Sequence, residues 1–211
     1  MVINKRKQFE KDLNTALVEN GYKKSSIQSI PFHIYRINDK ISKTVSMSYT
    51  SYLSVGHLLI DAFIGVSLHQ IDEMKYNLLE GYSRYRYKPS ETIWVPIYNY
   101  IPGGHMHYWD MSDISQSKDI VNDIICKIDK YGGAFFEPFG DGNLETIAEY
   151  LINEPKSCGW GNRDYIIPIV FYLLGEKQKG WKYIENRIDV YPKAYCEILD
   201  RVYLKNYLAL P

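Results

Sequence analysis

The segment that decides the fold is Ile41 to Thr50, which has the sequence ISKTVSMSYT. Its odd-numbered residues are mostly apolar, and every even-numbered residue is a serine or a threonine. Successive side chains of a β-strand point to opposite faces of the sheet, so this alternation gives one apolar face and one row of hydroxyls. The segment is therefore predicted to form a half-buried antiparallel strand.

The same alternation marks the sequence on both sides of this strand. Residues 30–35 alternate in hydrophobicity, and an Asn-Asp pair at 38–39 supplies turn chemistry before Ile41. Residues 57–69 (HLLIDAFIGVSLH) carry apolar side chains at every even position and a mixed set at the odd positions. This pattern predicts a central strand with one dry face and one mixed face.

Two further strands are expected later in the chain, at residues 84–87 and 93–98. Pro96 places the last strand at a sheet edge or a bulge, because proline has no N–H to donate to a ladder. Together these segments predict a meander of four to five antiparallel strands.

Amphipathic helices flank the strands. Residues 4–20 carry apolar side chains at helical spacing and are followed by Gly21, and helical periodicity returns in five segments after Asp113. Asp113 and Gln116 have the spacing of a capping box. The pair Gly132-Gly133 is expected to form a turn between helices.

This order of elements predicts an α+β fold. An N-terminal helix precedes the antiparallel meander, and a C-terminal group of about five helices packs on one sheet face. We expect residues 1–155 to form the α+β domain and residues 156–211 to form a helical C-terminal extension, either separate or sharing one core with the first. A chain of 211 residues fits one large domain or two small ones.

Composition excludes several classes of function. The 25 basic and 25 acidic residues give a formal net charge of zero, which disfavours nucleic acid and anionic membranes as partners. The N-terminus lacks the apolar stretch of a signal peptide, and the longest apolar run, residues 165–174, is about half a membrane span. The three cysteines form no metal or redox motif. We therefore expect a cytoplasmic protein, without a membrane span, whose thiols are reduced.

The first candidate site is the mixed face of the strand at 57–69. His57, Asp61, Ser67 and His69 are all odd-numbered and are predicted to share that face. His57 and Asp61 lie about 13 Å apart along a regular strand, which is too far for a catalytic base and the group that orients it. The alternatives are a polar binding face and an ordinary solvated sheet face.

The second candidate is a metal site. His105 and His107 share one side of an extended segment about 7 Å apart, and Asp110 or Asp113 can supply a carboxylate. Such a ligand set suits zinc or iron. The simpler interpretation is a loop, since Pro-Gly-Gly precedes the histidines.

Two other features can contact a partner. Arg84 and Arg86 alternate with tyrosines, which suggests single-stranded nucleic acid, but rings and guanidinium groups on one strand point to opposite faces. Trp160 stands between two glycines and is either a partner contact or a plug beneath its loop. The 20 tyrosines suit half-buried sheet faces and also recognition surfaces.

The order of elements also resembles a group of known proteins. The first helix followed by Asn20-Gly21-Tyr22-Lys23-Lys24, the meander, and the helix LETIAEYL at 144–151 are similar to features of certain uncharacterised bacterial proteins with domains of unknown function. The resemblance spans residues 4–155. Some members of such families resemble immunity proteins, which neutralise a partner toxin. The resemblance implies a protein partner and carries no catalytic residue over.

Two hypotheses follow from the sequence. The favoured one is a non-catalytic protein-binding module without a cofactor, which is immunity-like if the resemblance holds. The alternative is a metal-dependent hydrolase, or another enzyme, centred on His105 and His107. The sequence leaves the oligomeric state open.

Overall fold

The computed structural model describes residues 2–24, 32–52, 56–79, 92–103, 108–153, 162–190 and 198–211. The strands are β1 (Lys23–Lys24), β2 (Phe32–Arg36), β3 (Ile41–Tyr52), β4 (His57–Leu68), β5 (Ile93–Pro96) and β6 (Trp109–Met111). The α-helices are α1 (Val2–Glu19), α2 (His69–Leu78), α3 (Ser117–Phe136), α4 (Leu144–Asn153), α5 (Asn162–Leu173), α6 (Lys177–Val190) and α7 (Ile198–Leu208). Short 3-10 helices are η2 (Ile97–Tyr100), η3 (Ile114–Gln116) and η4 (Glu137–Phe139). The predicted α+β class is confirmed.

The described strands form one antiparallel sheet in the order β1-β2-β3-β4-β5. Strands β3 and β4 are its long centre, paired continuously from Ile41↔Leu68 to Tyr52↔His57. Strand β6 pairs with the start of β4, on the side opposite β3. Strand β5 ends the strand order, so Pro96 lies at a sheet edge as its missing N–H requires.

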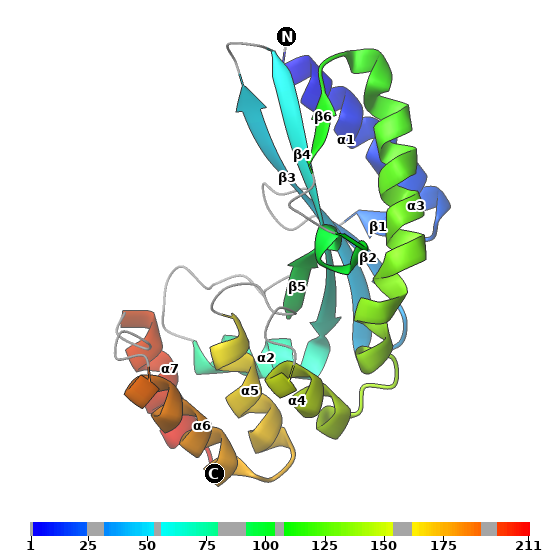
Figure 1. Ribbon diagram of the computed structural model, residues 1–211. Helices are drawn as coiled ribbons and strands as arrows, with labels where there is room; N and C mark the ends of the chain where they lie inside the picture. The colour runs from blue at the N-terminus through cyan, green and yellow to red at the C-terminus, as the bar shows by residue number, and fades with distance from the viewer. Residues whose placement is uncertain are drawn as a thin grey trace.

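Helices α1 and α3 lie side by side on the apolar face of the sheet (Figure 1). That face carries Val45, Met47 and Ile60, all buried, and α1 packs Phe9 edge-on against Tyr49 with ring centroids 6.0 Å apart. Lys5 of α1 donates hydrogen bonds to two backbone carbonyls, one before β4 and one after β6. These contacts fix the upper half of the β3–β4 ribbon against the helices.

The hydroxyl row of β3 divides into two halves. Ser42, Thr44 and Ser46 are buried, whereas Ser48 and Thr50 are exposed. The sequence predicts one uniform polar face, and the structure shows that only its second half meets solvent. A binding face on this side of the sheet therefore lies toward the β3–β4 hairpin.

The remaining helices continue beyond the far end of the sheet. In Figure 1, α5 and α7 lie against α2, and α6 packs on α5. Asn206 of α7 donates a hydrogen bond to the carbonyl of Leu78 at the end of α2. The buried residues of these helices, among them Ile166 and Tyr203, belong to the same core cluster as Phe9 of α1. None of the described helices is long and apolar enough to cross a membrane.

Three local predictions are corrected by the structure. The strand expected at residues 93–98 ends at Pro96, and Ile97–Tyr100 form the 3-10 helix η2. Strand β4 ends at Leu68, and His69 is the first residue of α2, where its N–H donates to the carbonyl of Lys40. Gly132 and Gly133 form no turn and lie within α3, because the Phe136 ring packs directly over Gly132 and Gly133 keeps helical geometry on the exposed side.

Candidate binding face

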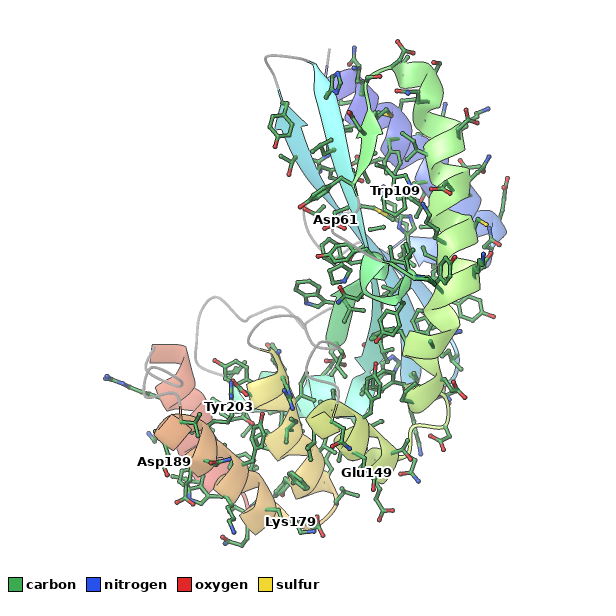
Figure 2. The ribbon with its side chains drawn as sticks, viewed as in Figure 1. Asp61, Trp109, Glu149, Lys179, Asp189 and Tyr203 are labelled. Atoms are coloured by element: carbon green, nitrogen blue, oxygen red, sulfur yellow. The ribbon has the colours of Figure 1, made fainter. Side chains whose placement is uncertain are left out.

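The sheet surface turned away from α1 and α3 is the candidate site. We call its solvent-facing part, near the β3–β4 hairpin, the open face. Side chains that face each other across antiparallel strands lie on the same side of the sheet, so pairing identifies its members. Its exposed or half-buried members are Ser48, Thr50, Tyr52, His57, Leu59 and Asp110, and the buried Asp61 lies among them. Figure 2 shows Asp61 on this side and Trp109 on the opposite side, toward α3.

His57 has a partner that the sequence did not indicate. Its Nδ1 lies 2.8 Å from Oδ2 of Asp110, which belongs to β6. Both side chains are exposed, and a polar contact in such an exposed position contributes little to stability. The His57–Asp110 pair is therefore a surface feature of the open face, consistent with the expectation that His57 and Asp61 do not interact directly.

Asp61 is the buried charge of this face. Its side chain is 9% exposed, and Oδ1 has no hydrogen-bond partner among the described residues. Burial raises the pKa of Asp61 to about 6, against a smaller lowering effect of a hydrogen bond from the backbone N–H of Ala62. A buried carboxylate with one unpaired oxygen and no opposite charge beside it among the described residues is costly, and a proton or a cation would relieve that cost.

Phe63 and Trp94 lie on the same side of the sheet as the Asp61 carboxylate. The charge of Asp61 also contributes to a raised pKa of Tyr98, after the larger effect of desolvation. Two residues further along β4, Phe63 packs edge-on against Trp94 of β5 with centroids 5.2 Å apart. Alternation along the two strands could have identified Phe63 and Trp94, whereas Tyr98 lies in η2, where the sequence predicts that the strand continues.

The C-terminal end of β4 contacts α2 and is not part of the open face. Ser67 donates a 2.7 Å hydrogen bond to Asp72 of α2, and both Asp72 and Lys75 are buried. Burial raises the pKa of Asp72 and lowers that of Lys75, while the opposite charges partly offset both shifts. Lys75 lies 5.7 Å from the ring centre of Tyr165 in α5, so this polar cluster joins the sheet to the C-terminal helices.

His69 is also engaged within the protein. Its Nε2 lies 3.0 Å from Oγ of Ser42, and its Nδ1 lies 2.8 Å from the carbonyl oxygen of Asp39, which accepts the Nδ1 proton. Ser42 is 3% exposed. A serine paired with an oriented imidazole resembles a nucleophile and its base, but this serine is buried and no described pocket opens onto it. These two contacts of His69 hold the β2–β3 turn and the start of β3 against the start of α2.

The predicted metal site is only partly within the described residues. Asp110 pairs with His57, and Asp113 forms the predicted capping box with Gln116 at the start of η3. Among the described residues, no group of three or more His, Cys, Asp and Glu side chains is placed to hold a metal. His105 and His107 lie outside those residues, as do Arg84, Arg86 and Trp160.

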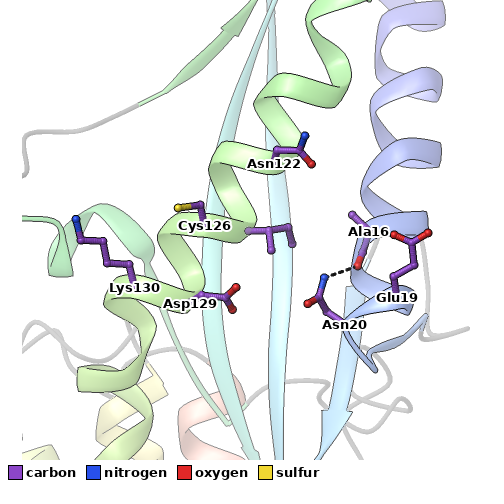
Figure 3. A pocket seen from close by; sticks show the side chains of 8 residues that line it. Ala16, Glu19, Asn20, Asn122, Cys126, Asp129 and Lys130 are labelled. Atoms are coloured by element: carbon purple, nitrogen blue, oxygen red, sulfur yellow. Dashed lines mark hydrogen bonds between the residues drawn. The ribbon is translucent and has the colours of Figure 1, made fainter.

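An open hollow of about 560 Å³ lies between α1 and α3 (Figure 3). Asp129 points toward Asn20, whose side-chain amide donates to the carbonyl of Ala16, while Cys126 and Lys130 point the other way. The polar groups in this hollow do not converge on one point. It therefore offers a weaker case for a specific site than the open face.

Comparison with known protein families, with characterised proteins and with solved structures found no match for this chain.

Proposed function

We propose that this protein is a non-catalytic binding module for a cytoplasmic protein partner, and that it binds an extended segment of the partner along the free edge of β3. The observation that carries the proposal is the length of β3. Its last pair with β2 is Phe32↔Ser46, and in the described part of the chain no strand lies beside Met47–Tyr52 on that side.

The backbone groups that face this edge can be assigned from the ladder. The carbonyl of Ile41 accepts from the N–H of Ile37 on the β2 side, whereas the carbonyl of Lys40 accepts from His69 on the β4 side. Backbone groups alternate in direction along a strand, so odd-numbered residues of β3 face away from β4. Tyr49 and Ser51 therefore present their N–H and C=O groups to the free edge.

The residues along the free edge of β3 favour pairing with another strand. Natural sheet edges are commonly protected by lysine, proline or a bulge, and the edge segment MSYTSY contains neither lysine nor proline. Tyrosine and threonine are good strand formers. An added strand obtains affinity from main-chain hydrogen bonds, and side-chain contacts on the adjoining faces supply specificity.

The resemblance to immunity-like proteins supports a narrower form of the proposal, in which the partner is a toxin. The metal-dependent alternative has less support, because Asp110 and Asp113 both have other roles in the structure. Metal content of protein purified without chelators tests that alternative directly.

A photocrosslinking side chain at the exposed Thr50 of β3 tests the proposal, with Lys182 on α6 as the matched exposed control. We expect an adduct with one partner from Thr50 alone, and the same adduct from the two purified proteins. Ser51→Pro removes one edge N–H and should abolish the adduct in a folded protein. An adduct that survives Ser51→Pro would contradict strand pairing, and an adduct between two copies of this chain would replace the partner with a homodimer.

Thr50→Pro provides the matched backbone control. By the same alternation, the N–H of Thr50 faces β4, where Thr50 pairs with Leu59. Proline at this position removes a ladder bond and should destabilise the sheet, whereas Ser51→Pro should not. Equal effects of the two substitutions on stability would show that the backbone directions are assigned wrongly.

A further inference from the structure

The Asp61 carboxylate is a buried acidic group that has no cationic side chain beside it among the described residues. Asp61 is buried, with 9% of the residue exposed, and Oδ1 has no hydrogen-bond partner within the described residues. Burial is the largest influence on its titration, and no described Lys, Arg or His side chain offsets its charge. The nearest candidate along the strand, His57, is paired with Asp110 instead.

The surroundings of Asp61 suit an organic cation. A carboxylate with aromatic rings nearby attracts ammonium and guanidinium groups, because the carboxylate is negatively charged and the ring faces carry a negative electrostatic potential. The Phe63–Trp94 pair lies on the same side of the sheet as Asp61 and extends toward β5, and the charge of Asp61 contributes to the raised pKa of Tyr98. Neutral polar ligands would gain less at this position, because only a cation offsets the buried charge.

The free edge of β3 lies within reach of this carboxylate. Asp61 pairs directly with Ser48, so a strand added beside β3 would run about 10 Å from β4, which is two strand spacings. Ser48, the side chain between them, is small and exposed. A long side chain can therefore lie across Ser48, whereas a short one on the added strand cannot reach Asp61.

We propose that Asp61 anchors a lysine or arginine side chain from the strand that the partner adds to β3. This inference rests on the proposed function for the source of the cation, but the anchor itself can be tested without the partner. The Asp61→Asn substitution keeps the shape of the side chain and removes its charge.

The first test uses n-butylguanidinium, which mimics the end of an arginine side chain. The carboxyl ¹³C resonances of labelled aspartates are followed through a pH titration, with Asp61 assigned by Asp61→Asn and exposed Asp141 as the internal control. We expect the cation to lower the apparent pKa of Asp61 by about one unit or more, since a neighbouring opposite charge lowers a carboxyl pKa by about 1–3 units. The pKa of Asp141 should change no more than it does in sodium chloride.

An unchanged Asp61 titration, or equal changes at Asp61 and Asp141, would overturn the anchor. The same titration in Ser51→Pro separates the proposed strand pairing from the proposed anchor at Asp61. A small cation does not pair with the edge of β3, so it should still bind to Asp61 in this variant. Loss of the partner adduct with normal cation binding in Ser51→Pro supports both proposals. Cation binding together with an undiminished adduct in Ser51→Pro supports the anchor and refutes strand pairing.

The second test establishes that the cation belongs to the partner. Asp61→Asn should weaken the purified complex by about 10-fold or more, because it leaves a partner cation in a partly desolvated site without its counter-ion. Equal affinities of Asp61→Asn and the unchanged protein would overturn the partner as the source. Replacement of the crosslinked segment's lysine or arginine with glutamine should then add no further loss to that of Asp61→Asn.

Discussion

Replacing Asp61 with asparagine should stabilise the unbound protein, and the gain should depend on pH. Burial raises the pKa of Asp61 to about 6 from an ordinary value of 3.8. At about 1.36 kcal/mol for each pKa unit, the difference corresponds to about 3 kcal/mol. Because the folded pKa is raised, the stabilising contribution of the protonated carboxyl is fully present below the unfolded pKa and is lost as pH rises through about 6.

Urea unfolding of both proteins between about pH 4 and pH 8 measures this effect. The free energy of unfolding of Asp61→Asn, relative to the unchanged protein, should rise by up to about 3 kcal/mol across that range. Asp72, whose pKa is also raised, titrates in both proteins and cancels in the comparison. A stability difference that stays constant with pH would refute the assignment of Asp61 as a buried, uncompensated carboxyl.

Other predictions concern the supporting fold. Gly180→Ala should destabilise the protein by about 1–3 kcal/mol, because a Cβ there would collide with Tyr207 and approach the carbonyl oxygen of Pro168 to 2.9 Å. Gly133→Ala should instead stabilise α3 by about 0.5–1 kcal/mol, because its Cβ would meet nothing within 4 Å. Thermal unfolding of the two variants checks both signs, and a stabilised Gly180→Ala would contradict the packing of α6 on α7. Asp113→Ala should destabilise the protein slightly through loss of the capping box and should leave metal content unchanged, so a loss of bound metal would restore the enzyme hypothesis.

Side-chain periodicity was sufficient to predict the centre of the fold. The alternation in β3 and β4 identified both strands, and their pairing confirms which side chains share a face. Periodicity could not locate the end of β4, because a strand and a following helix can both place His69 toward Ser42. Nor could it reveal that Gly132 lies in a helix, since the Phe136 ring that packs over it overrides the local preference of glycine for turns.

The candidate site was predictable only in part. The alternation of side chains along β4 placed Asp61 and His57 on one face. Asp110, the partner of His57, lies in β6, about fifty residues away in sequence, and the short WDM segment of β6 carried no strand signal. The pairing of His57 with Asp110 therefore required the tertiary structure. The burial of Asp61 required it as well, because local sequence does not specify which half of a polar sheet face meets solvent.

Amide hydrogen exchange of β3, in the free protein and in the purified complex, tests the central claim most directly. Backbone alternation predicts that the N–H groups of Ser48 and Thr50, which face β4, are protected in both states, whereas those of Tyr49 and Ser51 exchange rapidly until the partner binds. Slowed exchange at Tyr49 and Ser51 in the complex is the result that strand addition predicts. Rapid exchange at both positions in the complex would show that the partner binds elsewhere.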